Sequence, residues 1–489
     1  MYVDNWKSRF KHKLVEILGP EGVISSPDEL VAYECDGLTS YRVKPLFVVL
    51  PRSAIEVSEV VKLCSAENVP FVPRGAGTGL SGGALPVEDG VLISLSRMNR
   101  ILEVDIVNQR VVVEPGVVNI WVTNAVSNRG YYYAPDPSSQ IVCTIGGNVA
   151  ENSGGVHCLK YGVTVNHVLG LEVVLPDGEI IEFGGKTLDT PGYDITGIFV
   201  GSEGLLGIVT KVILRIVRRP EVVRTILAAF DRIEHAGAAV SGITARGIIP
   251  AGMEIMDRLS ILAVEKAVQP RYPTDAGAII LVELDGPSAE VEAHVCVVTE
   301  VLRENGATEI RVARDESERE LFWKGRKSAF AAMGRISPDY YVQDGVIPRT
   351  KLAEVLREIE RLAQRYGLKV ANVFHAGDGN LHPLILYDSS KEGEFERVEE
   401  LAGEILRVCV EAGGSITGEH GVGYDKKRFM PLMFTESDLD TMYLIKCAFD
   451  PKGLCNPGKV FPTPRSCVEA GATSYKEHPV EKMGLGKRF

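Results

Sequence analysis

Two histidines in the C-terminal half of the chain have the residue type and spacing to bind a metal ion. His375 and His382 lie on either side of an Ala-Gly-Asp-Gly-Asn-Leu segment with apolar runs outside it, which predicts a β-hairpin. With the turn centred on Asp378 and Gly379, the two histidines are directly opposed on one face, with Cβ atoms about 5 Å apart. Two imidazoles in that position can bind one cation. In an isolated hairpin, two solvated histidines remain the simpler interpretation.

A second segment supplies an oxygen ligand. Residues 418–421 read Gly-Glu-His-Gly and follow a short strand that we expect over residues 415–417. A carboxylate from Glu419 with two imidazoles suits Zn²⁺, Mn²⁺ or Fe²⁺ and leaves coordination positions open. His420 must point away from Glu419 on an extended chain, so it need not be a ligand, and it suits a general base that takes a hydroxyl proton. A glycine-rich turn with incidental charge is the alternative.

An arginine upstream could bind an anionic substrate. Arg326 lies within residues 320–330, which we expect to be helical. Its forked guanidinium can bind a carboxylate through two hydrogen bonds. An ordinary surface arginine explains the sequence equally well at this position.

Three glycine-rich loops precede these residues, over residues 74–83, 135–162 and 201–209. Glycine permits positive φ angles and close backbone approach, so consecutive N–H groups can curl around an anion. The spacing fits neither a Walker loop nor a dinucleotide-binding Rossmann fingerprint. Three such loops on one β-rich segment favour a long anionic ligand, and a dinucleotide fits better than a mononucleotide.

The elements that position these loops and side chains fall into two groups. Before residue 220, a helix over 54–68 begins at a Ser53 capping box, and a hairpin with an Asp-Gly turn covers 168–183. After residue 220, strands and helices alternate, which predicts an antiparallel sheet with helices on one face. We therefore expect a helical lead-in, a first domain, a second domain and a polar tail over residues 1–45, 46–220, 221–462 and 463–489.

Net charge, apolar runs and cysteine spacing argue against several classes of function. A net charge of −12 argues against nucleic-acid binding, and no apolar run approaches the length of a membrane span. The first 20 residues predict an amphipathic helix docked on protein. Nine scattered cysteines without a CxxC pair favour reduced cysteines in the cytoplasm, and they lack the clustering of an iron–sulfur site.

The three loops resemble the flavin domain of the vanillyl-alcohol-oxidase family, also called the PCMH type. This resemblance implies an α+β chain: a two-lobed FAD-binding domain of that type, then an α+β substrate domain with an antiparallel sheet, of the FAD-linked oxidase C-terminal type. The first loop has Thr78 and no histidine, so the resemblance implies non-covalent FAD. It implies FAD contacts at Arg74, Gly75, Ala76, Gly77, Thr78, Gly79, Ser81, Gly82, Ser139, Cys143, Thr144, Gly147, Asn152, Ser153, Gly154, Tyr161, Glu203, Gly207, Ile208 and Val209.

The C-terminal motifs resemble the FAD-linked D-2-hydroxyacid dehydrogenases, and the similarity covers residues 25–462, including a closing Asn-Pro-Gly-Lys at 456–459. It implies oxidation of a small 2-hydroxy acid, glycolate or D-lactate, to the 2-oxo acid. His375, His382 and Glu419 would hold a divalent metal, His420 would take the hydroxyl proton, and Arg326 would neutralise the substrate carboxylate. The hydride would pass to FAD.

Motifs at residues 33–37, 135–139, 156–162 and 335–341 are similar to the flavoprotein subunits of glycolate oxidases. That similarity implies a catalytic subunit with a second flavin-domain subunit and an iron–sulfur subunit as partners. The chain would then be cytoplasmic and would meet the inner face of the membrane only through those partners. Two alternatives stay open: a D-lactate dehydrogenase that passes electrons to cytochrome or an electron-transfer flavoprotein, and a flavin-fold scaffold subunit without chemistry.

Overall fold

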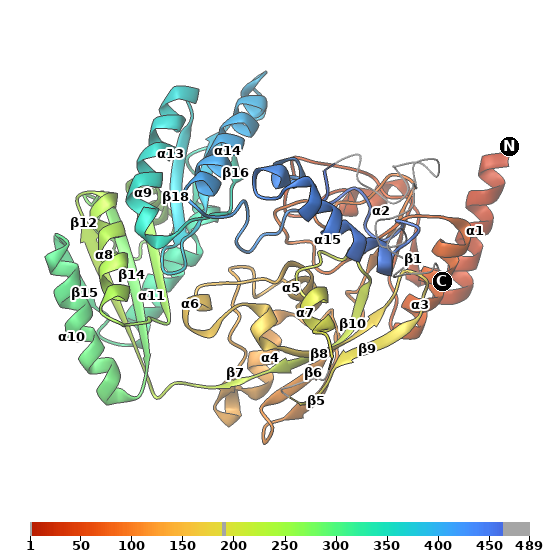
Figure 1. Ribbon diagram of the computed structural model, residues 1–489, viewed down its shortest axis with the longest axis horizontal. Coiled ribbons are helices and arrows are strands. Elements are labelled where there is room, and N and C mark those ends of the chain that lie inside the picture. Colours follow the sequence, from red (N-terminus) through yellow and green to blue (C-terminus); the bar gives the residue numbers. More distant parts are fainter. Residues whose placement is uncertain (1, 188–191, 463–489) are drawn as a thin grey trace.

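The computed structural model describes residues 2–187 and 192–462 of the 489. Figure 1 shows an elongated molecule in which the first half of the chain and helix α15 (Glu436–Phe449) lie toward one end, and the elements from β12 to α14, residues 222–411, lie at the other. The predicted polar tail over 463–489 lies outside the described residues. Within the described ranges, no helix combines the length and apolar character needed to cross a membrane.

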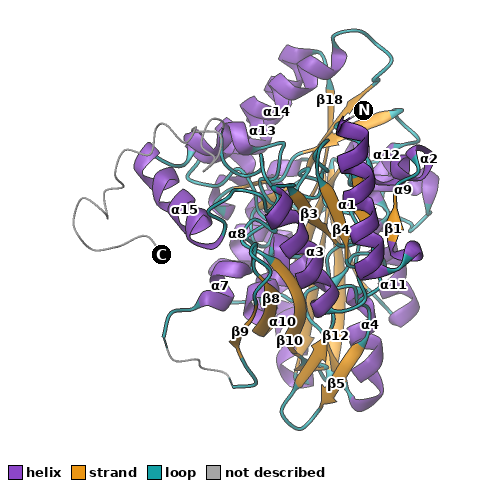
Figure 2. Cartoon of the chain, turned by 90° about the vertical axis from the view of Figure 1, so that its right-hand side faces the viewer, coloured by secondary structure: helices purple, strands orange, loops and turns teal. Residues whose placement is uncertain are grey.

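A four-stranded sheet forms the first lobe, in the order β1-β2-β4-β3. Its strands are β1 (Val23–Ile24), β2 (Phe47–Val49), β3 (Phe71–Arg74) and β4 (Val91–Ser94). Helices α1 (Tyr2–Leu18) and α3 (Ala54–Glu67) pack against each other beside this sheet (Figure 2). Phe10 and Leu14 of α1 are buried in the same core as β2 and β4, which confirms that the N-terminal helix docks on protein. The Ser53 hydroxyl caps α3, as predicted, by accepting a hydrogen bond from Glu56 N.

A five-stranded antiparallel sheet forms the second lobe, in the order β5-β6-β10-β8-β9. Its strands are β5 (Ile101–Asp105), β6 (Arg110–Val113), β8 (Val168–Val174), β9 (Ile180–Gly184) and β10 (Ile208–Arg215). The predicted hairpin is confirmed as β8 and β9, with Gly178 at a φ of +90° in the turn. Burial alternates along β10, so one face of this sheet packs on the core that contains α4 (Asn119–Val126), α5 (Ile145–Glu151) and α7 (Ile195–Phe199).

The second domain is built on one large antiparallel sheet in the order β15-β12-β14-β13-β18-β19-β17, with β20 also paired to β18 and β16 paired to β20. The strands are β12 (Val222–Phe230), β13 (Gly252–Asp257), β14 (Ala278–Gly286), β15 (Glu309–Val312), β16 (Asp339–Val342), β17 (Gly345–Val346), β18 (Lys369–His375), β19 (Asn380–Leu381) and β20 (Pro383–Tyr387). Together with the first domain, this arrangement confirms the predicted α+β fold class.

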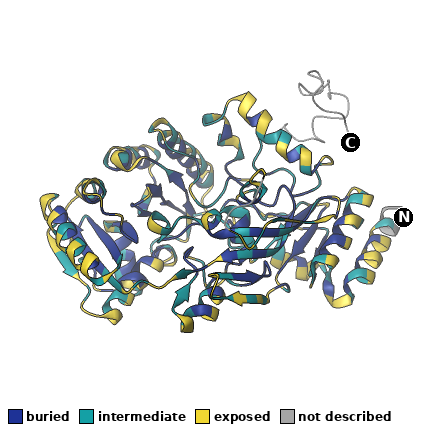
Figure 3. Cartoon of the chain, turned by 60° about the horizontal axis from the view of Figure 1, so that its bottom comes forward, coloured by how far each residue is buried: buried dark blue, intermediate teal, exposed yellow. Residues whose placement is uncertain are grey.

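Helices cover both faces of this sheet, so the expectation of helices on one face was wrong. One core holds α8 (Ile233–Ala245), α10 (Ser288–Glu304), α13 (Leu352–Tyr366) and α14 (Glu394–Glu411), and a second core holds α9 (Arg258–Ala267), α11 (Glu316–Lys327) and α12 (Ala329–Met333). Along β12, Ile226 and Ala228 face the first core while Leu227 and Ala229 face the second. The physical reason is visible in sequence: β12 and β14 carry continuous apolar runs, typical of strands covered on both sides. Figure 3 shows these strands buried between helices with exposed outer faces.

Two smaller expectations also fail. Residues 415–417 form no strand, because only Ser415 bridges to Val346. Cys447 is disulfide-bonded, so the expectation of reduced cysteines is wrong there, whereas Cys64, Cys409 and the other cysteines that can be described are free.

Candidate active site and cofactor cavity

The hairpin that carries the two histidines has a different register from the predicted one. His375 is opposed to Asn380, and Asn372 is opposed to Pro383. The direct pairing of His375 with His382 was therefore wrong by two residues. The cause lies in the turn, where Gly379 N donates to His375 O and Asp378 accepts from Asn380 N. Because side chains alternate with a period of two, a shift of two residues keeps both imidazoles on one face. Their ring centroids lie 5.1 Å apart.

The predicted metal ligands converge. Nε2 of His375 lies 3.2 Å from Oε1 of Glu419, and Nε2 of His382 lies 3.4 Å from the same oxygen. One ligand atom from each residue falls within 4.8 Å of the others. Within the described part of the chain, neither ring nitrogen of His382 makes a hydrogen bond, although this side chain is buried. Nε2 of His382 lies 3.4 Å from carboxylate oxygens of both Glu419 and Asp344, too far for a good hydrogen bond. A divalent cation among these atoms would satisfy the imidazole and the partly buried Glu419 carboxylate, so the donor set fits a metal ion.

Electrostatics hold this carboxylate ionised. Burial alone would raise the pKa of Glu419, but His375, His382 and His420 outweigh it and lower the pKa to about 2. The same geometry raises the pKa of His375 well above its usual value, since Glu254 and Glu419 outweigh its burial. A metal at Nε2 of His375 would take the place of a proton, so cation binding and proton release are coupled here.

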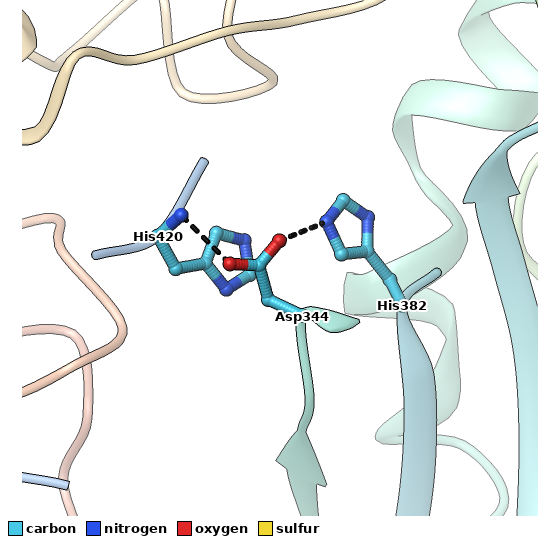
Figure 4. A group of neighbouring side chains, drawn as sticks. All are labelled: Asp344, His382 and His420. Carbon is cyan, nitrogen blue, oxygen red and sulfur yellow. Dashed lines mark hydrogen bonds and ion pairs between the residues drawn. The ribbon is translucent and has the colours of Figure 1, made fainter. Parts of the chain in front are cut away.

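Asp344 forms a second cluster with His382 and His420, shown in Figure 4. Its carboxylate is fully buried and accepts hydrogen bonds from the backbone N–H groups of residues 418, 419 and 420, and from the hydroxyl of Thr417 at 2.6 Å. Lys426 Nζ lies 3.2 Å away. Burial opposes ionisation, but Lys426 and the histidines keep the pKa of Asp344 well below its usual range. These donors use the oxygens of Asp344, so it anchors the 418–421 loop and is a poor metal ligand.

His420 is held as a neutral imidazole at the cavity wall. Its ring stacks on that of His382 at a centroid distance of 4.8 Å and an interplanar angle of 5°. Burial lowers the pKa of His420 to about 4, with Asp344 opposing that effect. Nδ1 of His420 makes no hydrogen bond with the residues that the structure describes. A neutral imidazole with a free nitrogen has the protonation state that a general base requires.

Arg326 lies behind the metal set and is not among the described residues that line the cavity. It is 2% exposed, and its Nε donates to Oε2 of Glu254 at 2.7 Å. Oε1 of Glu254 lies 2.6 Å from Nδ1 of His375. The surface arginine alternative is thereby excluded, and in this structure the guanidinium meets a protein carboxylate.

A deep cavity runs between the three glycine-rich loops and the metal set, with about 1480 Å³ of empty space including its mouth. Fifteen of the predicted FAD contacts line it: Arg74, Gly75, Ala76, Gly77, Thr78, Gly79, Ser139, Cys143, Thr144, Gly147, Ser153, Glu203, Gly207, Ile208 and Val209. From the second domain, Phe330, His382, Glu419 and His420 complete the wall. The cavity thus brings the predicted metal ligands and the predicted cofactor loops into one site.

The other five predicted contacts are placed around the cavity and support its wall. They are Ser81, Gly82, Asn152, Gly154 and Tyr161. The carbonyl of Ser81 accepts hydrogen bonds from the N–H groups of residues 424 and 425, and Asn152 ends α5. Gly154 packs against Glu419, and the hydroxyl of Tyr161 donates to Asp285. Close backbone packing explains why several positions in these loops are glycine. A Cβ at Gly75 would lie 2.3 Å from the Thr144 hydroxyl, which joins the first loop to the second.

The two domains are tied together directly at this site. The Glu203 carboxylate of the third loop accepts from the N–H groups of Val422 and Gly423 at 2.7 and 2.6 Å. The sequence analysis missed Glu254, Asp344 and Phe330 as site residues. A signal existed for Glu254 and Asp344, because each is a carboxylate whose two neighbours on either side are uncharged: Gly-Met and Ile-Met around Glu254, and Val-Gln and Gly-Val around Asp344. No spacing rule points to Phe330.

Comparison with solved structures defines the class of fold. The chain superposes on p-cresol methylhydroxylase with bound substrate at a TM-score of 0.80 and 18% identity, covering 93% of this chain and 96% of that one. It superposes on 4-ethylphenol oxidase from Gulosibacter chungangensis at 0.76 and 18%, covering 93% and 97%. At these identities the similarity shows the fold alone, and it confirms the predicted PCMH-type architecture.

Sequence comparison shows the family. Residues 45–184 match the FAD binding domain, and residues 219–460 match the C-terminal domain of FAD linked oxidases. The glycolate oxidase subunit GlcD of Escherichia coli K12 is 53% identical over 450 residues, covering 92% of this chain and 90% of the relative. GlcD of Bacillus subtilis is 41% identical (92% and 96%), and a D-lactate dehydrogenase of Archaeoglobus fulgidus is 33% identical (92% and 97%). The chain therefore belongs to the FAD linked oxidases and is an FAD-binding oxidoreductase.

Proposed function

We propose that this chain oxidises a small 2-hydroxy acid, glycolate or D-lactate, to the 2-oxo acid as the catalytic subunit of a glycolate oxidase complex. One observation carries the proposal: His382, Glu419 and His420 share a wall of the cavity that the FAD-type loops form. The names of the similar relatives support the substrate class, since both glycolate oxidase and D-lactate dehydrogenase act on such acids.

In this proposal, His375, His382 and Glu419 hold Zn²⁺, Mn²⁺ or Fe²⁺. A cation bound there would act as a Lewis acid on the substrate hydroxyl, and bound FAD would supply the hydride acceptor. His420 takes the hydroxyl proton on its free ring nitrogen. Asp344 keeps the 418–421 backbone in place during this proton transfer, because its carboxylate accepts hydrogen bonds from three N–H groups of that loop.

The proposed role of Arg326 is to balance the negative charge that a substrate carboxylate brings. Arg326 contacts Glu254, and Glu254 contacts His375, so the guanidinium lies behind His375. Its positive charge therefore acts on the site from a distance. A direct hydrogen bond to the carboxylate would require the guanidinium to leave Glu254. If Arg326 binds the substrate carboxylate directly, Arg326→Gln should raise KM strongly and leave the metal content unchanged.

The route of the electrons leads to proposed partners. The sequence carries no iron–sulfur motif, so we propose an iron–sulfur subunit and a second flavin-domain subunit as acceptors, with contact to the inner membrane face only through them. Two relatives are named as subunits, which supports an assembly. A cytoplasmic location follows from the same proposal.

A D-lactate dehydrogenase is the second candidate, favoured by relatives of that name at 33% identity. Anaerobic bleaching of the flavin separates the two: glycolate, D-lactate and L-lactate are each mixed with the FAD-loaded chain. Bleaching by D-lactate alone would discard the glycolate assignment, and no bleaching by any 2-hydroxy acid would favour the scaffold alternative. The same assay tests whether the reaction needs a metal. It is repeated after treatment with a chelator, and again after Zn²⁺, Mn²⁺ or Fe²⁺ is added back.

A further inference from the structure

Glu254 occupies an unusual place for a carboxylate. It lies in the middle of β13, is 1% exposed, and is the direct cross-strand neighbour of His375 on β18. Burying an ionised carboxylate is unfavourable unless it is paired and hydrogen-bonded. Here one oxygen lies 2.6 Å from His375 Nδ1, and the other accepts from Arg326 Nε at 2.7 Å with Nη2 at 2.6 Å. The carboxylate is thus fully occupied by one imidazole and one guanidinium.

This contact determines which ring nitrogen of His375 is available to a metal ion. An imidazole that donates Nδ1–H to a carboxylate keeps its lone pair on Nε2, which is the nitrogen that faces Glu419 and His382. A flip of the ring would leave Oε1 of the buried Glu254 carboxylate without its hydrogen bond, while Oε2 stays paired with Arg326. Among the described residues, His382 has no corresponding partner on its other nitrogen, so only one of the two histidines is oriented in this way.

We propose that Glu254 is a positioning residue that orients His375 for metal binding, and that Arg326 is the cationic partner that holds Glu254 in place in the interior. This inference rests on the proposed metal site. Carboxylates that orient metal-bound histidines are typically worth 10–100-fold in metal affinity (an order-of-magnitude range). Glu254 would therefore raise affinity without touching the ion.

The test compares Glu254→Gln with the parent chain, loaded with FAD, by competition between the protein and a chromophoric chelator for Zn²⁺. We expect the Kd for Zn²⁺ to rise by roughly 10- to 100-fold, and the absorption bands of bound Co²⁺ to shift because one ligand is misoriented. Glu283→Gln is the matched control. Glu283 is 3% exposed, lies on the neighbouring strand β14 and also pairs with an arginine and a histidine, but it does not contact the metal set. Its substitution should change the Kd by less than about twofold.

Arginine variants separate orientation from general damage. Arg326→Gln removes the guanidinium but leaves the Glu254 carboxylate beside His375, so the Kd for Zn²⁺ should rise by less than in Glu254→Gln. The double variant Glu254→Gln/Arg326→Gln has no unmatched buried charge and provides the measurement if Glu254→Gln alone does not fold. It should bind Zn²⁺ as weakly as Glu254→Gln.

The outcomes distinguish this inference from the function on which it rests. A parent chain that binds neither Zn²⁺ nor Co²⁺ refutes the proposed metal site, and the positioning role with it. A parent that binds Zn²⁺, together with Glu254→Gln or double-variant Kd values within twofold of it, overturns the positioning role alone. An equal loss in Glu283→Gln also overturns it, because the effect would then follow from losing any buried carboxylate.

Discussion

At the scale of single residues, the neighbours of each histidine decide its protonation state. His375 is surrounded by Glu254 and Glu419, which raise its pKa, whereas His420 has a buried environment that lowers its pKa to about 4. Two histidines that look alike in sequence thus divide into one that binds a positive charge and one that stays neutral. That division matches a ligand in the first case and a base in the second.

The role of His420 can be tested by His420→Ala. Removing a general base should slow flavin reduction by a 2-hydroxy acid by about 10²- to 10⁴-fold. Rapid-mixing absorbance at the flavin band measures this rate. FAD content and Zn²⁺ affinity serve as controls and should stay close to those of the parent, because His375, His382 and Glu419 are intact. An unchanged reduction rate would refute the base assignment.

At the scale of elements, the first glycine loop depends on backbone conformation. Gly77 has a φ of +69°, and a Cβ there would lie 2.2 Å from the Arg74 guanidinium. Gly77→Ala should cost about 1–3 kcal/mol in unfolding free energy from strain, and should lower the melting temperature of the FAD-free chain. Gly79→Ala is the control in the same loop, since nothing lies within 4 Å of its Cβ position. Equal melting temperatures for the two variants would contradict the strain argument.

The contact between the domains has its own titrating group, His157. Its ring lies 2.9 Å from Asp136 in the first domain and 3.0 Å from Glu283 in the second. Burial alone would lower the pKa of His157, but the two carboxylates raise it to about 10, above the ordinary value of 6.5. The protonated ring therefore stabilises the fold fully below pH 6.5, and this contribution is lost as the pH rises through 10. Arg319 and Lys327 face the same carboxylates, at 3.0 Å from Glu283 and 4.0 Å from Asp136.

His157→Gln tests this interface. Breaking a fully buried ion pair costs about 3–5 kcal/mol, and the His157 side chain is 24% exposed, so the cost here should be lower. The variant should melt below the parent at pH 6.5. The difference in melting temperature should shrink as the pH approaches 10, because the parent then loses the same charge. Calorimetry at several pH values measures both. A difference that stays constant with pH would show that His157 contributes packing and no charge.

At the scale of the whole molecule, the proposed reaction needs both domains and an outside electron acceptor. The cavity takes its predicted cofactor loops from one domain and its proposed catalytic side chains from the other, and Glu203 links them. We expect the isolated FAD-loaded chain to complete one flavin reduction by substrate rapidly and to turn over only with an artificial dye. Stopped-flow reduction compared with steady-state quinone reduction measures this. Steady quinone turnover by the chain alone would contradict the need for partner subunits.

Several features of this protein were determined by the sequence alone. The glycine loops, the Ser53 cap and the 168–183 hairpin were predicted correctly as elements. The structure brings His375, His382 and Glu419 together, and their role as metal ligands stays a prediction. These features depend on local chemistry: turn conformations that favour glycine, helix capping, and the donor atoms of the side chains. The segments that match the FAD linked oxidases, residues 45–184 and 219–460, include the first two glycine loops, His375, His382 and Glu419.

The tertiary structure decided how these parts meet. The hairpin register depends on hydrogen bonds across the turn, which no residue pattern specifies to within two positions. The second layer of helices depends on which surfaces find each other after folding. Arg326 was expected to face a substrate and instead pairs with Glu254, 72 residues away in sequence. A buried charge selects its partner by proximity in space, and that proximity exists only once β13, β18 and α11 have packed together.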